Sequence, residues 1–410
     1  MEKVAVTIQP ALMVIVLINP TNSMKTKVLL YSLLFFLLLS CNDSRKSKES
    51  SSLQITSISI PENLSINTPI DSLFSEIKLL PLETKQGYEI ADIFHFIVYD
   101  SLIMINDDRK RLLIFNNNGK LVRQIGRRGE GPGEYLSLRD FYVNAQKEIE
   151  ILDFKKIERY TLDGQHISTS RFDLLDKYEC NPSNFCAAPS GGYFLWGGTL
   201  GIKDASPRRS MLYHVNNSIQ IIEGYFPITH PAGGALYRFS TYKNLILIEP
   251  IFGDYYIYQI DSLGKVSPRY QYDFGKRSYH GKLDFRKNMS PDEINQINES
   301  VIQMINFQET DQWLHVDFGF KGKVYSSFYC KEKAKIYLTN VNAIKKNPEE
   351  FCFWWARQAY KNTLINPVEA SWICEELNRL SPQTIEKWKL EAYRDIKEDD
   401  NPVLVFYKFK

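Results

Sequence analysis

Residues 114–122 read IFNNNGKLV, which is an apolar strand, a polar turn ending in Asn-Gly and the start of a second strand. The unit returns at 159–167 as RYTLDGQHI and at 258–266 as YQIDSLGKV, with a looser copy, LYHVNNSIQI, at 212–221. Its aromatic position recurs at intervals of 45, 53 and 45 residues, at Phe115, Tyr160, Tyr213 and Tyr258. Asn-Gly and Asp-Gly indicate hairpins, because both central residues of a type I′ turn need positive φ. A period of about 40 to 50 residues with several strands per unit predicts the blades of a β-propeller.

The strands around this unit can be grouped into blades. Blade one is expected at 90–125, with strands at 102–106, 112–116 and 121–125, and the next three at 138–172, 185–226 and 236–274. Alternation at 312–340 predicts a fifth blade, whereas a sixth is harder to see. The 24 Tyr, 24 Phe and 6 Trp favour strands, because flat side chains pack well on a pleated surface.

Two stretches read as helices and two as terminal strands. Ser290-Pro291 and Ser381-Pro382 are typical helix starts, so helical insertions are expected near 290–306 and 366–397, the second of which could be a small helical subdomain. Strands are expected at 76–83 and 401–410. Propellers commonly complete one blade from both ends of the chain, which removes an exposed sheet edge, so these two strands are predicted to share the last blade.

The segment from Met24 to Cys41 predicts export. Lys25 and Lys27 precede an apolar run of 12 residues, Val28 to Leu39, which is too short to span a membrane but suits a signal-peptide core. The run ends in LLSC, which resembles the bacterial lipobox and implies lipidation of Cys41. We expect residues 24–40 to be a signal peptide, the polar 41–52 a flexible tether and 53–410 the propeller. Residues 1–23 precede this signal and are interpreted as a mis-called upstream extension, with Met24 as the start.

Composition excludes several classes of function. The formal net charge is +2, from 50 basic and 48 acidic residues without a long run of one sign, so nucleic acid is not an expected partner. The six His are scattered and no C-x-x-C or H-E-x-x-H occurs, so neither a metal site nor a cofactor is expected. Five Cys remain beside Cys41; Cys180 and Cys186 could bridge a loop, and an odd number leaves at least one unpaired.

The loop after blade one has unusual chemistry. Residues 126–135 read GRRGEGPGEY, with four Gly in eight residues, and lack the Gly-Lys-Ser/Thr ending of a phosphate loop. In a propeller this loop links the outer strand of one blade to the inner strand of the next, at the rim of the ligand-binding face. Its charged residues either line a polar ligand site or are solvated on a structural connector; they are Arg127, Arg128, Glu130 and Glu134.

These pieces together resemble a known family. The lipobox at Cys41, Leu-Pro-Leu-Glu at 80–83, the loop at 126–135 and Asn-Pro-Val-Leu at 401–404 are similar to the six-bladed β-propeller lipoproteins of the Bacteroidetes, which are distantly NHL-repeat-like. The resemblance runs from about residue 53 to 410 and implies six blades and an extracytoplasmic location, without an activity. Surface-exported members often carry acidic residues just after the Cys. Here Asp43 is followed by Ser44-Arg45-Lys46, so the choice between the periplasmic and the surface face of the outer membrane stays open.

Two classes of function are compatible with the sequence. The first is a non-catalytic, membrane-anchored protein whose propeller face binds a glycan, a peptide or an envelope protein. The second is a hydrolase or lyase with acid–base residues at the channel mouth, for which Asp107, Asp108, Arg127 and Glu130 are the candidates. Asp107-Asp108 precedes Arg109-Lys110-Arg111 and reads as an exposed turn, and no Gly-x-Ser-x-Gly elbow occurs. Binding is therefore favoured over catalysis.

Overall fold

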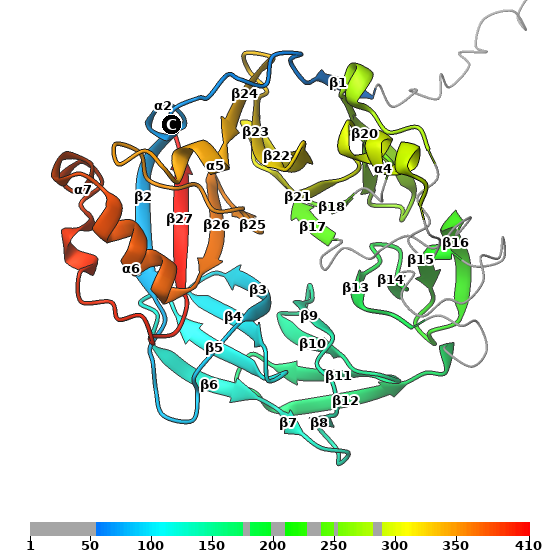
Figure 1. Ribbon diagram of the computed structural model, residues 1–410. Coiled ribbons are helices and arrows are strands. Elements are labelled where there is room, and N and C mark those ends of the chain that lie inside the picture. The colour runs from blue at the N-terminus through cyan, green and yellow to red at the C-terminus, as the bar shows by residue number, and fades with distance from the viewer. Residues whose placement is uncertain (1–54, 175–180, 198–209, 228–238, 250–252, 282–288) are drawn as a thin grey trace, which may run out of the picture. The chain divides into compact units, whose positions relative to one another are not determined.

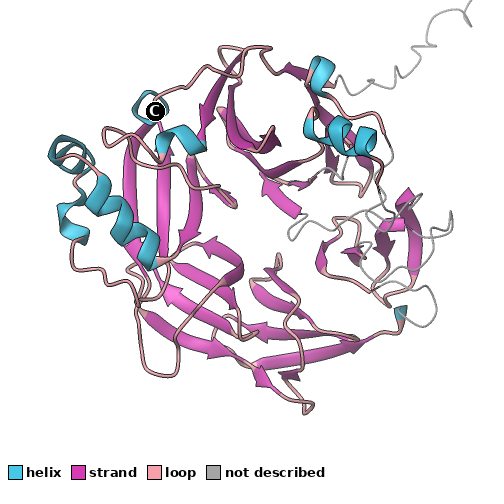
Figure 2. Cartoon of the chain, viewed as in Figure 1, coloured by secondary structure: helices cyan, strands magenta, loops and turns pink. Residues whose placement is uncertain are grey.

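The computed structural model describes residues 55–410 apart from 175–180, 198–209, 228–238, 250–252 and 282–288. The predicted signal peptide, Cys41, the tether and Cys180 lie outside the described residues, so these predictions stay predictions. In the described part strands dominate, and the longer helices lie at the outside of the ring (Figure 2). Among its helices, none is long and apolar enough to cross a membrane.

Six sheets are arranged around a common axis as the blades of a propeller (Figure 1). Blade one contains β3 (Ile93–Tyr99), β4 (Leu102–Asp107), β5 (Leu112–Asn116) and β6 (Leu121–Ile125), and blade two β9 (Asp140–Val143), β10 (Glu148–Leu152), β11 (Lys156–Thr161) and β12 (His166–Arg171). Blade three contains β13 (Asn184–Ala187), β14 (Tyr193–Trp196), β15 (Ser210–Val215) and β16 (Ile221–Pro227), and blade four β17 (Phe239–Tyr242), β18 (Leu245–Ile248), β19 (Tyr256–Ile260) and β20 (Val266–Asp273). Blade five contains β21 (Met304–Glu309), β22 (Trp313–Phe320), β23 (Lys323–Cys330) and β24 (Lys335–Asn340). The all-β fold and the predicted blades are confirmed.

Blade six is the one that the repeat did not reveal. It contains β25 (Gln358–Tyr360), β26 (Thr363–Val368) and β27 (Val403–Phe409), and its outer strand is β2 (Phe74–Pro81) from the other end of the described chain. Strands β2 and β27 pair antiparallel, with Ile77 opposite Tyr407 and Leu79 opposite Val405. The prediction that the terminal strands share the last blade is confirmed.

The repeated hairpins are confirmed, but their turn type was predicted wrongly. In the turn after β5 only Gly119 has positive φ (74°), and Asn118 does not. The strand register shifts between Ile114 and Phe115, as it does at the same place in the hairpins after β11 and β15, and it shifts earlier in β19, between Ile257 and Tyr258. The turn is therefore the kind in which one glycine in the left-handed region closes a bulge, and not type I′. Asn116 holds it by accepting hydrogen bonds from the backbone N–H of Asn118 and Lys120 (2.9 and 3.0 Å).

The core is divided among the spaces between blades. Among the described residues there are six hydrophobic clusters, and each combines side chains of two neighbouring blades. Each sheet is thus buried on both faces, which explains why strands such as 112–115 are continuous apolar runs rather than alternating ones. The repeat aromatics serve this packing: Phe115, Tyr160 and Tyr213 each pack against the preceding blade of the ring.

Side chains of neighbouring blades close the inner edges of the sheets. The innermost strands are β3, β9, β13, β17, β21 and β25, whose axial edges have no strand partner in the described part of the chain (Figure 1). Exposed edge N–H groups need an acceptor. These acceptors come from the preceding blade of the ring: the N–H of Val98 donates to Gln358, that of Ala359 to Gln308, that of Phe307 to Glu249 and that of Phe185 to Asp140, at 2.8 to 3.0 Å. The ring is therefore closed by hydrogen bonds at its centre as well as by the shared last blade.

The helical stretches are shorter than predicted. Helix α4 (Pro291–Asn298) has the expected Ser290 capping box, but residues 304–306 belong to strand β21, because Met304 and Phe307 are needed in the core between blades four and five. In the second stretch, 366–368 ends strand β26, and the helices are α6 (Ala370–Arg379), α7 (Pro382–Trp388) and η2 (Leu390–Tyr393). Leu364 and Val368 face the core shared with blade five and Ile365 faces the core shared with blade one, so this segment is buried on both faces as a strand.

The remaining elements lie at the outer edge. Strand β1 (Thr56–Ser59) adds a parallel fifth strand to β20, and α2 (Ile70–Leu73) leads into β2. Arg277, in η1 (Gly275–Arg277), donates to the backbone oxygens of Ile60, Pro61 and Glu62 and so fixes the segment after β1. Helix α5 (Val341–Ile344) follows β24, and the short strands β7 (Arg127–Arg128) and β8 (Glu134–Tyr135) pair with each other outside blades one and two (Figure 1).

Candidate functional site

A cavity of about 460 Å³ opens on the face where the innermost strands begin. Ile93 starts β3, Asn306 lies near the start of β21, and Arg357 immediately precedes β25. Val368 ends β26, and Pro402 immediately precedes β27. Blades one, four, five and six contribute to the wall, so the cavity exists only because the ring is closed.

Three tryptophans form the aromatic part of the wall. Trp354 is buried, whereas Trp355 and Trp372 are 44% and 46% exposed. Trp354 and Trp355 come from the segment that enters blade six, and Trp372 comes from the first turn of α6. Exposed tryptophans need no explanation one at a time, but two of them on the wall of one cavity mark a surface that is built to contact a partner.

The polar part of the wall includes a buried amide. Asn366 is 8% exposed and lies in β26 opposite Val405. Its side chain makes no hydrogen bond or ion pair to any other described residue. The amide is not among the unpartnered side-chain atoms that are closed off from solvent, so its donors and acceptor are open to the cavity and available to a ligand. Glu369, next to β26, is exposed and likewise has no side-chain partner among the described residues.

Irregular backbone shapes the wall at two inner strands. The register of β21 shifts between Ile305 and Gln308, and Asn306 there has φ +58°, a left-handed conformation that Asn tolerates better than most residues. Its amide donates to the carboxylate of the buried Asp317 (2.9 Å). The register of β3 also shifts, between Ile93 and His95. Bulges of this kind re-aim side chains and are over-represented beside binding sites.

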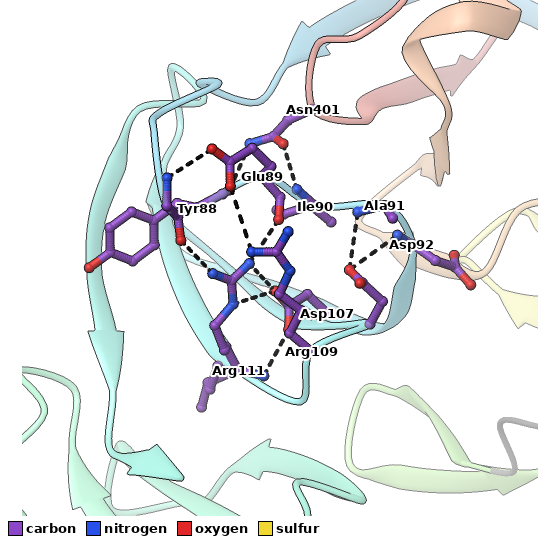
Figure 3. Close-up of polar contacts among 12 residues, drawn as sticks. Tyr88, Glu89, Ile90, Ala91, Asp92, Asp107, Arg109, Arg111 and Asn401 are labelled. Atoms are coloured by element: carbon purple, nitrogen blue, oxygen red, sulfur yellow. Dashed lines mark hydrogen bonds and ion pairs between the residues drawn. The ribbon is translucent and has the colours of Figure 1, made fainter.

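The segment 87–92 supplies the cavity wall of blade one and is held from two sides (Figure 3). On one side the buried Asn401 accepts the N–H of Ile90 (2.8 Å) and donates to the carbonyl oxygens of Glu83 and Tyr88 (2.9 and 3.2 Å). On the other side the hairpin after β4 contributes Asp107, Asp108, Arg109 and Arg111. Ala91 and Asp92 are therefore presented to the cavity by a fixed loop.

The charged side chains of that hairpin bond to one another and to the backbone of segment 87–92. Arg111 donates to Asp107 through Nε (2.7 Å) and to the carbonyl oxygens of Gly87 and Glu89 (2.7 and 2.9 Å). Asp108 accepts the N–H groups of Ala91 and Asp92 (3.0 and 3.4 Å). Asp107 is fully buried, so the prediction of an exposed turn was wrong for this residue: its carboxylate lies inside because it neutralises Arg111.

Among the cavity-lining residues, acids outnumber bases. Asp92, Glu249 and Glu369 carry carboxylates, and Arg357 carries the single guanidinium on the described wall. Glu249 is 8% exposed and accepts the N–H of Phe307 (2.8 Å), and Arg357 donates to the carbonyl oxygen of Ile93 (2.9 Å). Among the described residues there is no group of three or more His, Cys, Asp or Glu that could hold a metal ion.

Comparison with known proteins now places the chain in a family. The sequence profile described as "Domain of unknown function (DUF4934)" matches residues 55–408. The chain belongs to the DUF4934 family. A solved structure of a candidate exported protein from Bacteroides fragilis is similar to it, with a TM-score of 0.66 and 17% identity over 87% of this chain and 99% of that chain. A protein of unknown function from Bacteroides caccae has a TM-score of 0.38 and 8% identity over 64% of this chain and 85% of that chain. No curated protein matches.

In this DUF4934 chain the loop at 126–135 lies at the outer edge of blades one and two, away from the axis (Figure 1). It makes the predicted connection from the outer strand β6 to the inner strand β9. Glu134 accepts Arg127 Nε (2.6 Å) and the N–H of Gly131 (2.9 Å), and the backbone donor, followed by the guanidinium, lowers the pKa of this carboxyl. Tyr135 anchors the end of the loop, donating to the carbonyl oxygen of Ile125 (2.9 Å). These contacts hold the loop in shape.

The other loop residues keep their charges exposed. Arg128 and Glu130 have no side-chain hydrogen bond or ion pair among the described residues, and Arg127 is 79% exposed. No contact between described residues joins Asp107 or Asp108 to Arg127 or Glu130, so the four candidates for acid–base chemistry are not brought into one cluster. Ligand binding by the loop stays a prediction.

Sequence reasoning missed the cavity of this DUF4934 chain. Its aromatic and amide residues lie in 351–372, where neither the hairpin repeat nor the period of a strand was visible. The segment FCFWWARQAY at 351–360 was a usable signal, because two adjacent Trp near Arg357 do not fit a simple buried strand.

Cys186 is a free thiol whose pKa is raised by burial, and the predicted partner of its disulfide, Cys180, lies outside the described residues.

Proposed function

We propose that this DUF4934 protein is an extracytoplasmic, lipid-anchored binding protein that holds a carbohydrate in the cavity of blades one, four, five and six. The observation that carries the proposal is Asn366, a nine-tenths buried amide at the cavity wall that has no partner among the described residues. The exposed indoles of Trp355 and Trp372 on the same wall also support it. A sugar ring offers a face of C–H groups that packs on flat aromatic rings and a rim of hydroxyls that need both donors and acceptors.

The size of the cavity fits this class of ligand. Sites for small molecules are typically concave spaces of about 300 to 1,000 Å³ with apolar walls and a few fixed polar groups. Here the polar groups are the Asn366 amide and the carboxylates of Asp92 and Glu369, and the bulged strands β3 and β21 give the wall its shape. An amide both donates and accepts, so Asn366 suits a hydroxyl group, which does the same.

Anchoring through Cys41 is proposed from the lipobox at 38–41, and the similarity to a candidate exported protein of Bacteroides fragilis agrees with export. Several acyl chains make a durable anchor, because each buried CH₂ contributes about 0.8 kcal/mol. Metabolic labelling with palmitate should mark the wild-type chain, whereas Cys41→Ser should stay unlabelled and leave the membrane fraction. A membrane-bound, labelled Cys41→Ser protein would contradict the anchor.

The binding site is tested on a glycan array with the purified full chain and matched variants. Trp355→Ala, Trp372→Ala and Asn366→Ala should each lower the affinity for the glycan that the wild type binds, by about fivefold or more, because aromatic stacking and a hydrogen bond to the ligand are each worth about 1 kcal/mol. Trp355 and Trp372 are half exposed, so their removal leaves the core intact.

The double variant Arg127→Ala plus Arg128→Ala is the matched control, because it changes an exposed loop at the outer edge of the ring. Its binding should equal that of the wild type. Loss of binding in this control, with the tryptophan variants unaffected, would move the site to the loop. Binding of peptides but of no glycan would refute the ligand class.

A further inference from the structure

The charge of the cavity wall decides which carbohydrates it can hold. Asp92 and Glu369 are exposed at the cavity, and Glu249 lies deeper in its wall. Arg357 is the single cation on the described wall, and its guanidinium is directed to the carbonyl oxygen of Ile93 (2.9 Å). The described wall therefore carries three carboxylates against one guanidinium.

Two lysines lie near the wall of the cavity but do not line it. Lys110 Nζ lies 3.6 Å from the ring centre of Phe94, and burial lowers the pKa of this lysine while Asp107, Asp108 and Asp92 oppose the shift. Lys345 Nζ lies 5.4 Å from the ring centre of Trp372. Neither lysine belongs to the wall of the cavity. The indoles add to the effect of the carboxylates, because the face of an aromatic ring attracts cations and not anions.

We propose that the cavity selects carbohydrates by charge: it accepts neutral and amino sugars and rejects uronic acids and other anionic sugars. The proposal rests on the proposed function, since it names the class of ligand for the same site. The ammonium of an amino sugar in this cavity would be attracted by the carboxylates of Asp92 and Glu369 and by the faces of the exposed indoles. A carboxylate in that place would face like charges, which is how sites reject wrong partners.

The test uses sugars that differ in charge and not in ring geometry. Immobilised oligosaccharides of the gluco, galacto and manno series are each presented as the neutral, the 2-amino and the uronic acid form, in mildly acidic buffer where the amino groups are protonated. The described wall carries three carboxylates against one guanidinium, and like charges repel near a protein surface, so the uronic form should bind at least about tenfold more weakly than the neutral form.

Charge-neutralising variants test whether the carboxylates of the wall cause the selection. Asp92→Asn plus Glu369→Gln keeps the shape of the wall and should raise the affinity for uronic oligomers while lowering the affinity for amino sugars. Raised salt should weaken amino-sugar binding and leave neutral sugars unchanged. Uronic acids bound as tightly as the neutral forms by the wild type would overturn the charge selection and leave the proposed function intact. A chain that binds no oligosaccharide in any series would overturn both.

Discussion

Removing the side-chain amide of Asn401 should loosen the closure of the ring and the cavity together. Asn401 is 2% exposed and lies just before β27, and its amide joins the C-terminal segment to residues 83–90. It accepts the N–H of Ile90 and donates to the carbonyl oxygens of Glu83 and Tyr88 (Figure 3). Segment 87–92 continues into the cavity wall through Ala91 and Asp92.

The magnitude follows from three hydrogen bonds. Each contributes about 0.5 to 1.5 kcal/mol net, and their loss in Asn401→Ala leaves three buried or half-buried backbone groups without this partner, so the free energy of unfolding should fall by about 3 kcal/mol. Asn401→Asp keeps the acceptor for Ile90 but turns an oxygen toward two carbonyl oxygens and buries a charge. We expect it to be at least as destabilising as the alanine variant.

The assay combines urea unfolding, followed by tryptophan fluorescence, with amide hydrogen exchange. Exchange should speed up first in residues 83–92, because their local contacts are lost, whereas strands β10 and β11 of blade two should keep their protection. Thr84→Val is the matched control at the same junction. The exposed Thr84 donates its hydroxyl to Asp400 (3.0 Å) and accepts the N–H of Asn401 (2.9 Å), and removal of this hydroxyl should cost less than about 1 kcal/mol. A loss below about 1 kcal/mol for Asn401→Ala, or equal exchange in both regions, would refute the reasoning.

Two further predictions concern the repeat and the pH dependence. Gly119→Ala should destabilise the chain by several kcal/mol more than Gly87→Ala. Both glycines have positive φ, which costs alanine about 1 kcal/mol. An added Cβ at 119 would lie 2.1 Å from the carbonyl oxygen of Pro81, whereas a Cβ at 87 would meet nothing within 4 Å. Equal midpoints in thermal unfolding would contradict this. Burial raises the pKa of Tyr135 to about 12, so the folded state holds this proton above the ordinary pKa of about 10 while the unfolded state releases it. The stabilisation is present below about pH 10 and is lost as the pH rises toward 12; Tyr135→Phe should show a shallower alkaline loss of stability, and an unchanged slope would remove Tyr135 from the cause.

The sequence by itself determined the features that rest on local chemistry. The hairpin at 114–122 was readable because Asn-Gly turns bend a chain in a defined way, and its recurrence predicted blades. The apolar terminal strands at 76–83 and 401–410 predicted ring closure because an unpaired edge must be covered. The turn type was not readable, because the bulge that sets Gly119 apart from Asn118 depends on how β5 and β6 pair.

Only the tertiary structure decided where the candidate site lies. Its wall joins residues from 91–93, 249, 303–306 and 354–372, which are far apart in the sequence. They meet because the ring is closed, with blade six packed against blade one. Sequence patterns report which side chains are apolar, and Asn366 then looks like an ordinary polar residue of an unassigned segment. That Asn366 is nine-tenths buried and lines one cavity with two exposed indoles, without a described side-chain partner, follows from the packing of the blades. This packing is a long-range property of the closed ring.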